Sequence, residues 1–260
     1  MPDGKALQMG TSHFLGQNFS KPFEVKFADK DNVEHFAWQT SWGVSWRLIG
    51  AMIMAHGDDK GLVLPPKVAP MQIVIVPIYR NEEGKNSVLP KVEEIQNKLE
   101  SKDIRIHVDD REGLSPGYKF NDWELKGVPL RIEIGPKDIE NQKIVVAKRY
   151  NLEKIDLSFE EIEKIPIILD EIQVEMLKKA KEQAQNNTLE ITDYLDFKSK
   201  IEKGGFFNSP WCGKLECEDK IKEETGAEIR VIPFNSEDST KECIYCKEPS
   251  TSIPIFARGY

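Results

Sequence analysis

The stretch that decides the fold is residues 39–66, QTSWGVSWRLIGAMIMAHGDDKGLVLPP. Its centre, residues 47–54, is apolar apart from an arginine in the first turn, which predicts an amphipathic to fully buried helix with a strand-turn-strand segment on either side. A guanidinium near a helix N-terminus, beside a glycine that lets the backbone approach a ligand, is suited to holding a phosphate. The same pattern also fits a buried helix that carries a surface arginine, and spacing alone leaves both interpretations open.

Composition limits the class of protein. The 260 residues are 31% charged and 39% hydrophobic, which is typical of a soluble globular chain with room for one large domain or two to three small ones. A net charge of -8 argues against a sequence-independent coat for nucleic acid, but it leaves room for RNA binding through a local basic surface. No stretch has the length and apolarity of a membrane span, and the N-terminus lacks an apolar signal core. A cytoplasmic protein is the simplest interpretation.

Residues 1–70 alternate short apolar runs with polar turns. The segments 23–27 and 34–39 have extended patterns and flank the turn cluster 28–32, so a hairpin is expected. The run 61–64 predicts a last strand, which two prolines stop. These segments predict an antiparallel sheet with a helix, too small for a complete catalytic domain.

Residues 71–157 change to an alternating β–α pattern. The run 71–78 is rich in β-branched residues and predicts a strand that is buried on both faces. Further helices are expected over 88–101 and 115–126, and further strands over 104–108, 130–134 and 143–147. Such alternation at short spacing predicts an α/β layer with a mostly parallel sheet.

Residues 158–187 predict a connecting helix. The tetrapeptide SFEE at 158–161 is a capping box, so a helix is expected to begin there. Pro166 lies inside the apolar stripe that follows, and it is expected to kink the helix or to restart it. This helix would join the α/β layer to a C-terminal module, residues 188–260.

Four cysteines occur in two closely spaced pairs, Cys212 with Cys217 and Cys243 with Cys246. Each pair supplies two thiolates from one turn, and a fold that brings the pairs together forms a tetrahedral four-thiolate site for Zn²⁺. Such a zinc ion would be structural, since no position remains for water. The alternatives are four unliganded thiols or a remnant site that has lost its metal.

Several short segments in the N-terminal region resemble sequence motifs of a known family. TSWG at 40–43, RLIG at 47–50, HGDD at 56–59 and GLVLPP at 61–66 resemble motif 3 of class II aminoacyl-tRNA synthetases, in the version of the prolyl-tRNA synthetases of archaeal and eukaryotic-like type. QMGTSH at 8–13 and LGQNFSK at 15–21 match another family segment, and the likeness continues to Tyr260. It implies an α/β fold, α+β overall: a partial class II antiparallel sheet, an α/β anticodon-binding domain at 71–157 and a small zinc-bearing module at 188–260.

The resemblance implies roles for residues of the partial catalytic domain. Gln8 and Thr11 match residues that touch ATP, and Arg47 matches the arginine that binds the nucleotide phosphates, with Mg²⁺ accompanying the ATP. His13 matches a residue of the proline pocket, and Trp42 is suited to walling a pocket for a pyrrolidine ring. Without the resemblance, a lone histidine is usually structural, and the aromatic residue fits a core position equally well.

The middle region resembles the anticodon-binding domain shared by several class II synthetases, through PGYKFNDWELKGVP at 116–129 and LRIEIGP at 130–136. Single-stranded bases are recognised by stacking on aromatic rings and by polar contacts to their edges. The candidate tRNA contacts are Arg111, Phe120, Trp123, Glu124, Lys126, Arg131 and Lys137. Basic residues interleaved with aromatics are also common on a solvated face above a core.

The implied activity is that of a proline-tRNA ligase, which activates L-proline with ATP and transfers it to the tRNA for proline, as a homodimer in the intact enzyme. The family's motifs 1 and 2 have no counterpart in the sequence, so the chain alone is expected to be inactive, and no catalytic residue is assigned. One alternative is a freestanding tRNA-binding or regulatory paralogue without catalysis. Another is a structural zinc module that binds protein partners, which leaves the words at 8–47 unexplained.

Overall fold

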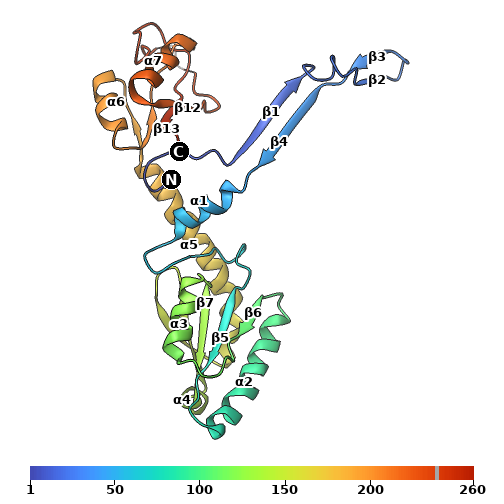
Figure 1. Ribbon diagram of the computed structural model, residues 1–260, viewed down its shortest axis with the longest axis vertical. Helices are drawn as coiled ribbons and strands as arrows, with labels where there is room; N and C mark the ends of the chain where they lie inside the picture. Colours follow the sequence, from blue (N-terminus) through green and yellow to red (C-terminus); the bar gives the residue numbers. More distant parts are fainter. Residues whose placement is uncertain (238–239) are drawn as a thin grey trace. The chain divides into compact units, whose positions relative to one another are not determined.

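The computed structural model describes residues 1–237 and 240–260 (Figure 1). The chain forms two compact units, one of residues 52–187 and one that joins residues 1–51 to 188–260. One unit boundary falls inside helix α1 (Arg47–His56), and another falls between residues 187 and 188. The mixture of sheets and helices confirms the predicted α/β, overall α+β, class.

The unit of residues 52–187 is built on a five-stranded sheet in the order β6-β5-β7-β8-β9. Its strands are β5 (Ile73–Pro77), β6 (Ile106–Val108), β7 (Leu130–Ile134), β8 (Lys143–Lys148) and β9 (Lys154–Ser158). β5 pairs in parallel with β6 and β7, whereas β8 is antiparallel to both β7 and β9. The sheet is therefore mixed rather than mostly parallel. The connection between β7 and β8 holds only the short helix α4 (Pro136–Glu140), too little chain for a parallel crossover.

Helices cover both faces of this sheet (Figure 1). Ile73 and Ile75 of β5 pack in one core with α2 (Glu82–Glu100) and α5 (Ile165–Asn186). Val74 and Val76 point to the opposite face, where they pack against α3 (Pro116–Leu125). All five residues of β5 are buried, so the prediction of a strand buried on both faces is confirmed.

Local capping signals act where the sequence places them. The Ser158 amide donates to the Glu161 carboxylate at 3.0 Å, and the Glu161 amide donates to the Ser158 hydroxyl at 3.3 Å, so the capping box forms. It begins a 3₁₀ segment, η1 (Glu160–Lys164), and α5 then starts with Pro166 in its first turn. The expected restart at Pro166 is thus confirmed. Proline is tolerated there because the backbone N–H that it lacks would have no partner within the first turn of a helix.

The predicted strand over residues 61–64 is wrong. This segment is extended, but its amides pair with the end of α3 rather than with a strand: Leu62 donates to the carbonyl of Leu125 at 3.0 Å, and Leu64 to that of Gly127 at 3.2 Å. Because backbone donors need acceptors wherever they lie, an extended run can satisfy them without joining a sheet.

Residues 1–51 form an extended ribbon. β1 (Gly10–Gly16) pairs antiparallel with β4 (Gln39–Val44), and the predicted hairpin is confirmed as the short strands β2 (Lys26–Ala28) and β3 (Glu34–Phe36). The helix expected at residues 47–54 is present as α1, but it is not fully buried. Among the described residues of α1 only Ala51 is buried.

The module of residues 188–260 has a four-stranded sheet in the order β10-β11-β13-β12. The strands are β10 (Thr188–Glu190), β11 (Phe206–Asn208), β12 (Ala227–Val231) and β13 (Ile255–Arg258), and the helices are α6 (Tyr194–Ile201) and α7 (Leu215–Thr225). Phe197 meets the rings of Phe207 and Phe256 edge to face at 5.6 and 5.7 Å, which forms the centre of its core. In residues 1–237 and 240–260 no helix has the length and apolarity that a membrane crossing requires.

Candidate functional sites

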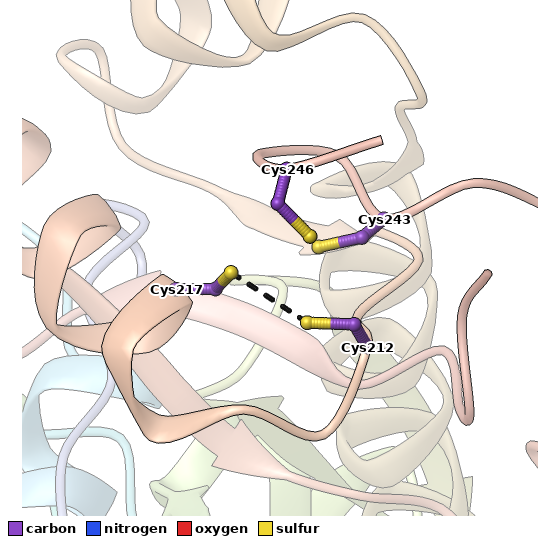
Figure 2. A group of neighbouring side chains, drawn as sticks. All are labelled: Cys212, Cys217, Cys243 and Cys246. Carbon is purple, nitrogen blue, oxygen red and sulfur yellow. Dashed lines mark hydrogen bonds between the residues drawn. The ribbon is translucent and has the colours of Figure 1, made fainter. Parts of the chain in front are cut away.

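The four cysteines converge in the C-terminal module. Cys217 lies on α7, Cys212 precedes that helix, and Cys243 and Cys246 come from the segment between β12 and β13. Their side chains point toward one another, and all four sulfur atoms lie within 4.8 Å of each other (Figure 2). A tetrahedral zinc ion with Zn–S bonds of about 2.3 Å spaces its sulfurs at about 3.8 Å. The donor set therefore fits a four-thiolate metal ion without rearrangement of the backbone.

The surroundings of the sulfurs favour a bound cation. Burial raises the pKa of the thiols of Cys212 and Cys217, so unliganded thiolates would be costly there. At Cys243 burial acts in the same direction, but backbone N–H groups of Cys246, Tyr245 and Cys212 outweigh it and lower the pKa. Amide donors aimed at a sulfur stabilise the thiolate, which is the form that binds metal.

A second cluster lies where α3 meets β7. The Arg131 guanidinium sits 4.3 Å from the centre of the Phe120 ring and bonds to Glu133 at 2.8 Å. Glu124, on the same helix as Phe120, pairs with Lys60 at 3.2 Å. Beside this pair lies a cavity of about 190 Å³, which Lys60, Glu124 and Arg131 line together with Trp123. Its charged lining residues are Lys60, Glu124, Arg131, Lys148, Arg149 and Lys154.

This cavity and the Phe120 ring beside Arg131 combine features that suit a single-stranded base. The Phe120 ring is half-buried and flanked by cations, and Glu124 provides an acceptor. Lys60, Lys148 and Lys154 were not among the predicted contacts. Lys148 and Lys154 belong to the β8–β9 hairpin, and the alternating pattern of KIDLS at 154–158 was the available signal for that strand.

Three other predicted tRNA contacts, on α3 or next to it, interact with other protein groups. Trp123 is only 5% exposed, and its indole N–H donates to Asp109 at 2.7 Å. Arg111 grips the same carboxylate with two bonds of 2.8 and 2.7 Å, and Lys126 lies 4.4 Å from the Trp123 ring. Burial would raise the pKa of Asp109, but the bonds from Arg111 and Trp123 hold it well below its usual range. Trp123 therefore lines the cavity with only a small exposed fraction and belongs mainly to the core, which disfavours base stacking on its ring.

Lys137 lies apart from this network. It is exposed on α4, in the connection between β7 and β8. The structure thus packs Phe120 against Arg131 and lines the cavity with Glu124 and Arg131, whereas Lys137 is exposed on a neighbouring element.

The predicted nucleotide residues line one open groove of about 360 Å³ in the ribbon unit. Gln8 and Thr11 come from β1 and the segment before it, and Arg47 comes from the first turn of α1. Arg47 donates to the backbone carbonyl of Gln8 across a long 3.4 Å. Its weakly held guanidinium at the helix N-terminus is suited to an anionic group.

The two predicted proline-pocket residues do not share a face of the ribbon. His13 lies opposite Ser41, and Trp42 lies opposite Ser12, so the two side chains alternate to different sides. Trp42 is 79% exposed. Phe14 shares the side of Trp42 but stacks on Trp38, with ring centres 5.8 Å apart.

Two family models match parts of the chain. Residues 72–167, which include the five-stranded sheet, match the family model described as an anticodon binding domain. Residues 194–260 match the model described as the C-terminal domain of prolyl-tRNA synthetase. The chain therefore contains an anticodon-binding domain of the kind found in aminoacyl-tRNA synthetases.

Similarity to curated proteins indicates which kind of aminoacyl-tRNA synthetase this chain resembles. The chain is 56% identical over 262 residues to a protein of Cenarchaeum symbiosum named proline-tRNA ligase, 49% identical over 261 residues to one of Porphyromonas gingivalis, and 47% identical over 262 residues to proline-tRNA ligase 2 of Clostridioides difficile. Each alignment covers 100% of this chain and 53–54% of the relative. The chain belongs to the prolyl-tRNA synthetase family, and it spans about half the length of the curated relatives it matches.

Proposed function

We propose that this chain provides the tRNA-binding part and the motif 3 part of a proline-tRNA ligase, which activates proline with ATP and transfers it to its tRNA. The observation that carries the proposal is a cavity of the anticodon-binding domain that Glu124 and Arg131 line, with the Phe120 ring packed against the Arg131 guanidinium. A cytoplasmic location and a homodimer in the intact enzyme belong to the same proposal.

In this proposal the cavity recognises a base of the anticodon. The Phe120 ring stacks on the base, Arg131 and the neighbouring lysines offset the backbone charge, and Glu124 accepts from an exposed base edge. Anticodons for proline share two guanines, whose Watson–Crick edges carry donors that a carboxylate accepts. Arg111, Lys126 and Lys137 act at longer range, through the electrostatic attraction of phosphates.

Binding of purified, zinc-replete chain to transcripts of proline tRNA tests this role, with native and altered anticodons at constant salt. The native anticodon should bind more tightly, and Glu124→Gln should reduce that preference by about tenfold to a hundredfold. Glu140→Gln, at an exposed position on α4, is the matched control and should leave the preference unchanged. Equal binding of all transcripts by the unaltered chain would contradict the proposal.

The groove of Gln8, Thr11 and Arg47 would hold ATP with its Mg²⁺, and His13 and Trp42 would contribute to the proline pocket from different sides. Arg47 supplies positive charge that stabilises the triphosphate when the carboxylate of proline attacks. Among the described lining residues Arg47 is the single charged group. Because positioning supplies much of a rate enhancement, we expect no proline-dependent pyrophosphate exchange by this polypeptide alone. Measurable exchange would overturn that expectation.

We also infer that the four cysteines hold a structural Zn²⁺ ion. Support comes from the convergence of four sulfurs and from the amide donors at Cys243. Metal analysis of protein purified without added zinc tests the inference, and about one zinc per chain is expected.

A further inference from the structure

The loop that carries Cys243 and Cys246 is held by the two residues between them. Ile244 is completely buried in the core of the module, and its amide donates to the carbonyl of Pro210 at 2.9 Å. Tyr245 points toward α7 instead, where its hydroxyl donates to Glu224 at 3.2 Å. One side of the loop is therefore anchored by apolar burial, and on the other side the partly buried Tyr245 bonds to a carboxylate of α7.

Glu224 connects this loop to two helices. It follows Cys217 by seven residues on α7, so both side chains lie on the same face of that helix. Its second carboxylate oxygen accepts from the Tyr194 hydroxyl at 3.0 Å and from the Lys198 ammonium at 2.8 Å, both on α6. The rings of Tyr194 and Tyr245 also meet edge to face at 5.2 Å.

We propose that Glu224 is a positioning residue for the metal centre, which acts through Tyr245 to hold the 243–246 loop against the helix that carries Cys217. Groups that orient metal ligands usually raise affinity because they reduce the reorganisation that binding requires. The inference rests on the proposed zinc site and reaches further, since Glu224 contributes no ligand atom. The contact from Tyr245 is the step that couples it to the metal.

Metal affinity of the full chain tests the proposal, measured by zinc competition with a chromophoric chelator and by the absorption of the Co²⁺-substituted protein. Glu224→Ala and Tyr245→Phe should each weaken zinc binding by about tenfold and broaden the Co²⁺ thiolate bands. Glu224→Gln keeps an acceptor oxygen for Tyr245 and should restore most of the affinity.

Two variants separate positioning from general stability. Tyr194→Phe removes a bond to Glu224 but leaves the contact from Tyr245, so its affinity should stay within about twofold of the unaltered chain. Glu223→Ala removes the neighbouring residue of α7, which pairs with the exposed Lys220, and should have equally little effect. Far-UV circular dichroism of each variant confirms that the helices persist.

Three outcomes would overturn the proposal. The first is zinc affinity within about twofold of the unaltered chain in both Tyr245→Phe and Glu224→Ala. The second is a loss in Glu223→Ala equal to that in Tyr245→Phe, which would indicate general destabilisation. The third is the absence of Co²⁺ thiolate bands from the unaltered chain, which would remove the metal site itself while leaving the tRNA-binding proposal to its own test.

Discussion

Asp58 belongs to the segment HGDD at 56–59, which resembles a family motif, and in the structure it forms an ion pair within the protein. Both of its oxygens accept from Arg149, at 2.8 and 2.6 Å, and the Arg149 guanidinium is buried. This bidentate bond joins the segment after α1 to the end of β8. The hydrogen bonds from Arg149 lower the pKa of Asp58 to about 2, despite an opposing contribution from burial.

Replacement of Asp58 by Asn should make stability depend less on pH. Since the folded pKa lies below the unfolded one of about 3.9, the stabilisation is present above about pH 4 and is lost as pH falls toward 2. Asp58 is 42% exposed, so solvent screening limits the effect to about 1 kcal/mol. Urea unfolding at pH 7 should show this loss in Asp58→Asn, and the two proteins should converge near pH 2. An equal difference at both pH values would assign the effect to another cause.

Phe120 and Trp123 both lie on α3, but Phe120 is half-buried whereas Trp123 is buried. Phe120→Leu should weaken binding of the tRNA for proline by about 1 to 3 kcal/mol through lost stacking, and cost under about 1.5 kcal/mol of stability. Trp123→Ala should instead cost about 3 to 5 kcal/mol of stability, because the indole fills the core beneath α3. Thermal unfolding and tRNA binding of both variants distinguish the roles. Unchanged tRNA binding in Phe120→Leu would exclude stacking on this ring.

At the scale of elements, the hydrogen bonds between segment 61–64 and the end of α3 depend on Gly127, which follows that helix. Gly127 has φ of +73°, and a Cβ atom there would lie 2.5 Å from the carbonyl oxygen of Leu62. The sequence pattern predicted a strand at residues 61–64. It could not show that their partner is the end of a helix, since that depends on a residue sixty positions away.

Gly127→Ala should therefore destabilise the unit of residues 52–187 by about 2 kcal/mol or more, through both backbone strain and the clash. Gly117→Ala is the matched control within α3, since no atom lies within 4 Å of its added Cβ, and it should be neutral or stabilising by up to about 1 kcal/mol. Denaturant midpoints of the two variants provide the comparison. A neutral Gly127→Ala would show that the segment adjusts freely.

For the molecule as a whole, the two sheets depend on different sources of stability. The unit of residues 52–187 has cores on both faces of its sheet, whereas the module of residues 188–260 has one small aromatic core beside four cysteines. Small domains with limited cores commonly rely on a metal ion for stability.

Removal of zinc by a strong chelator should therefore loosen the module and spare the anticodon-binding domain. Hydrogen exchange followed by mass spectrometry should show faster exchange in α7 and β13 and unchanged protection in β5 and β7. Zinc added back should reverse the change. Uniform protection with and without chelator would show that the module is stable without metal.

Sequence by itself determined the features that depend on near neighbours or on residue chemistry. The buried run of β5, the capping box at Ser158, the restart at Pro166 and the paired spacing of the cysteines follow from local patterns. The family words at 8–66 and 116–136 also indicated the class of protein, since residues at functional positions are specified by the ligand as well as by the fold.

Only the tertiary structure decided which faces are covered and which side chains meet. It placed Trp123 in a core, set His13 and Trp42 on different sides of the ribbon, left α1 exposed, and brought Glu224 to Tyr245. The physical reason is that burial and hydrogen-bond partnership depend on contacts between segments distant in the chain. A local pattern specifies that a residue is apolar or polar, whereas the packed structure selects its partner.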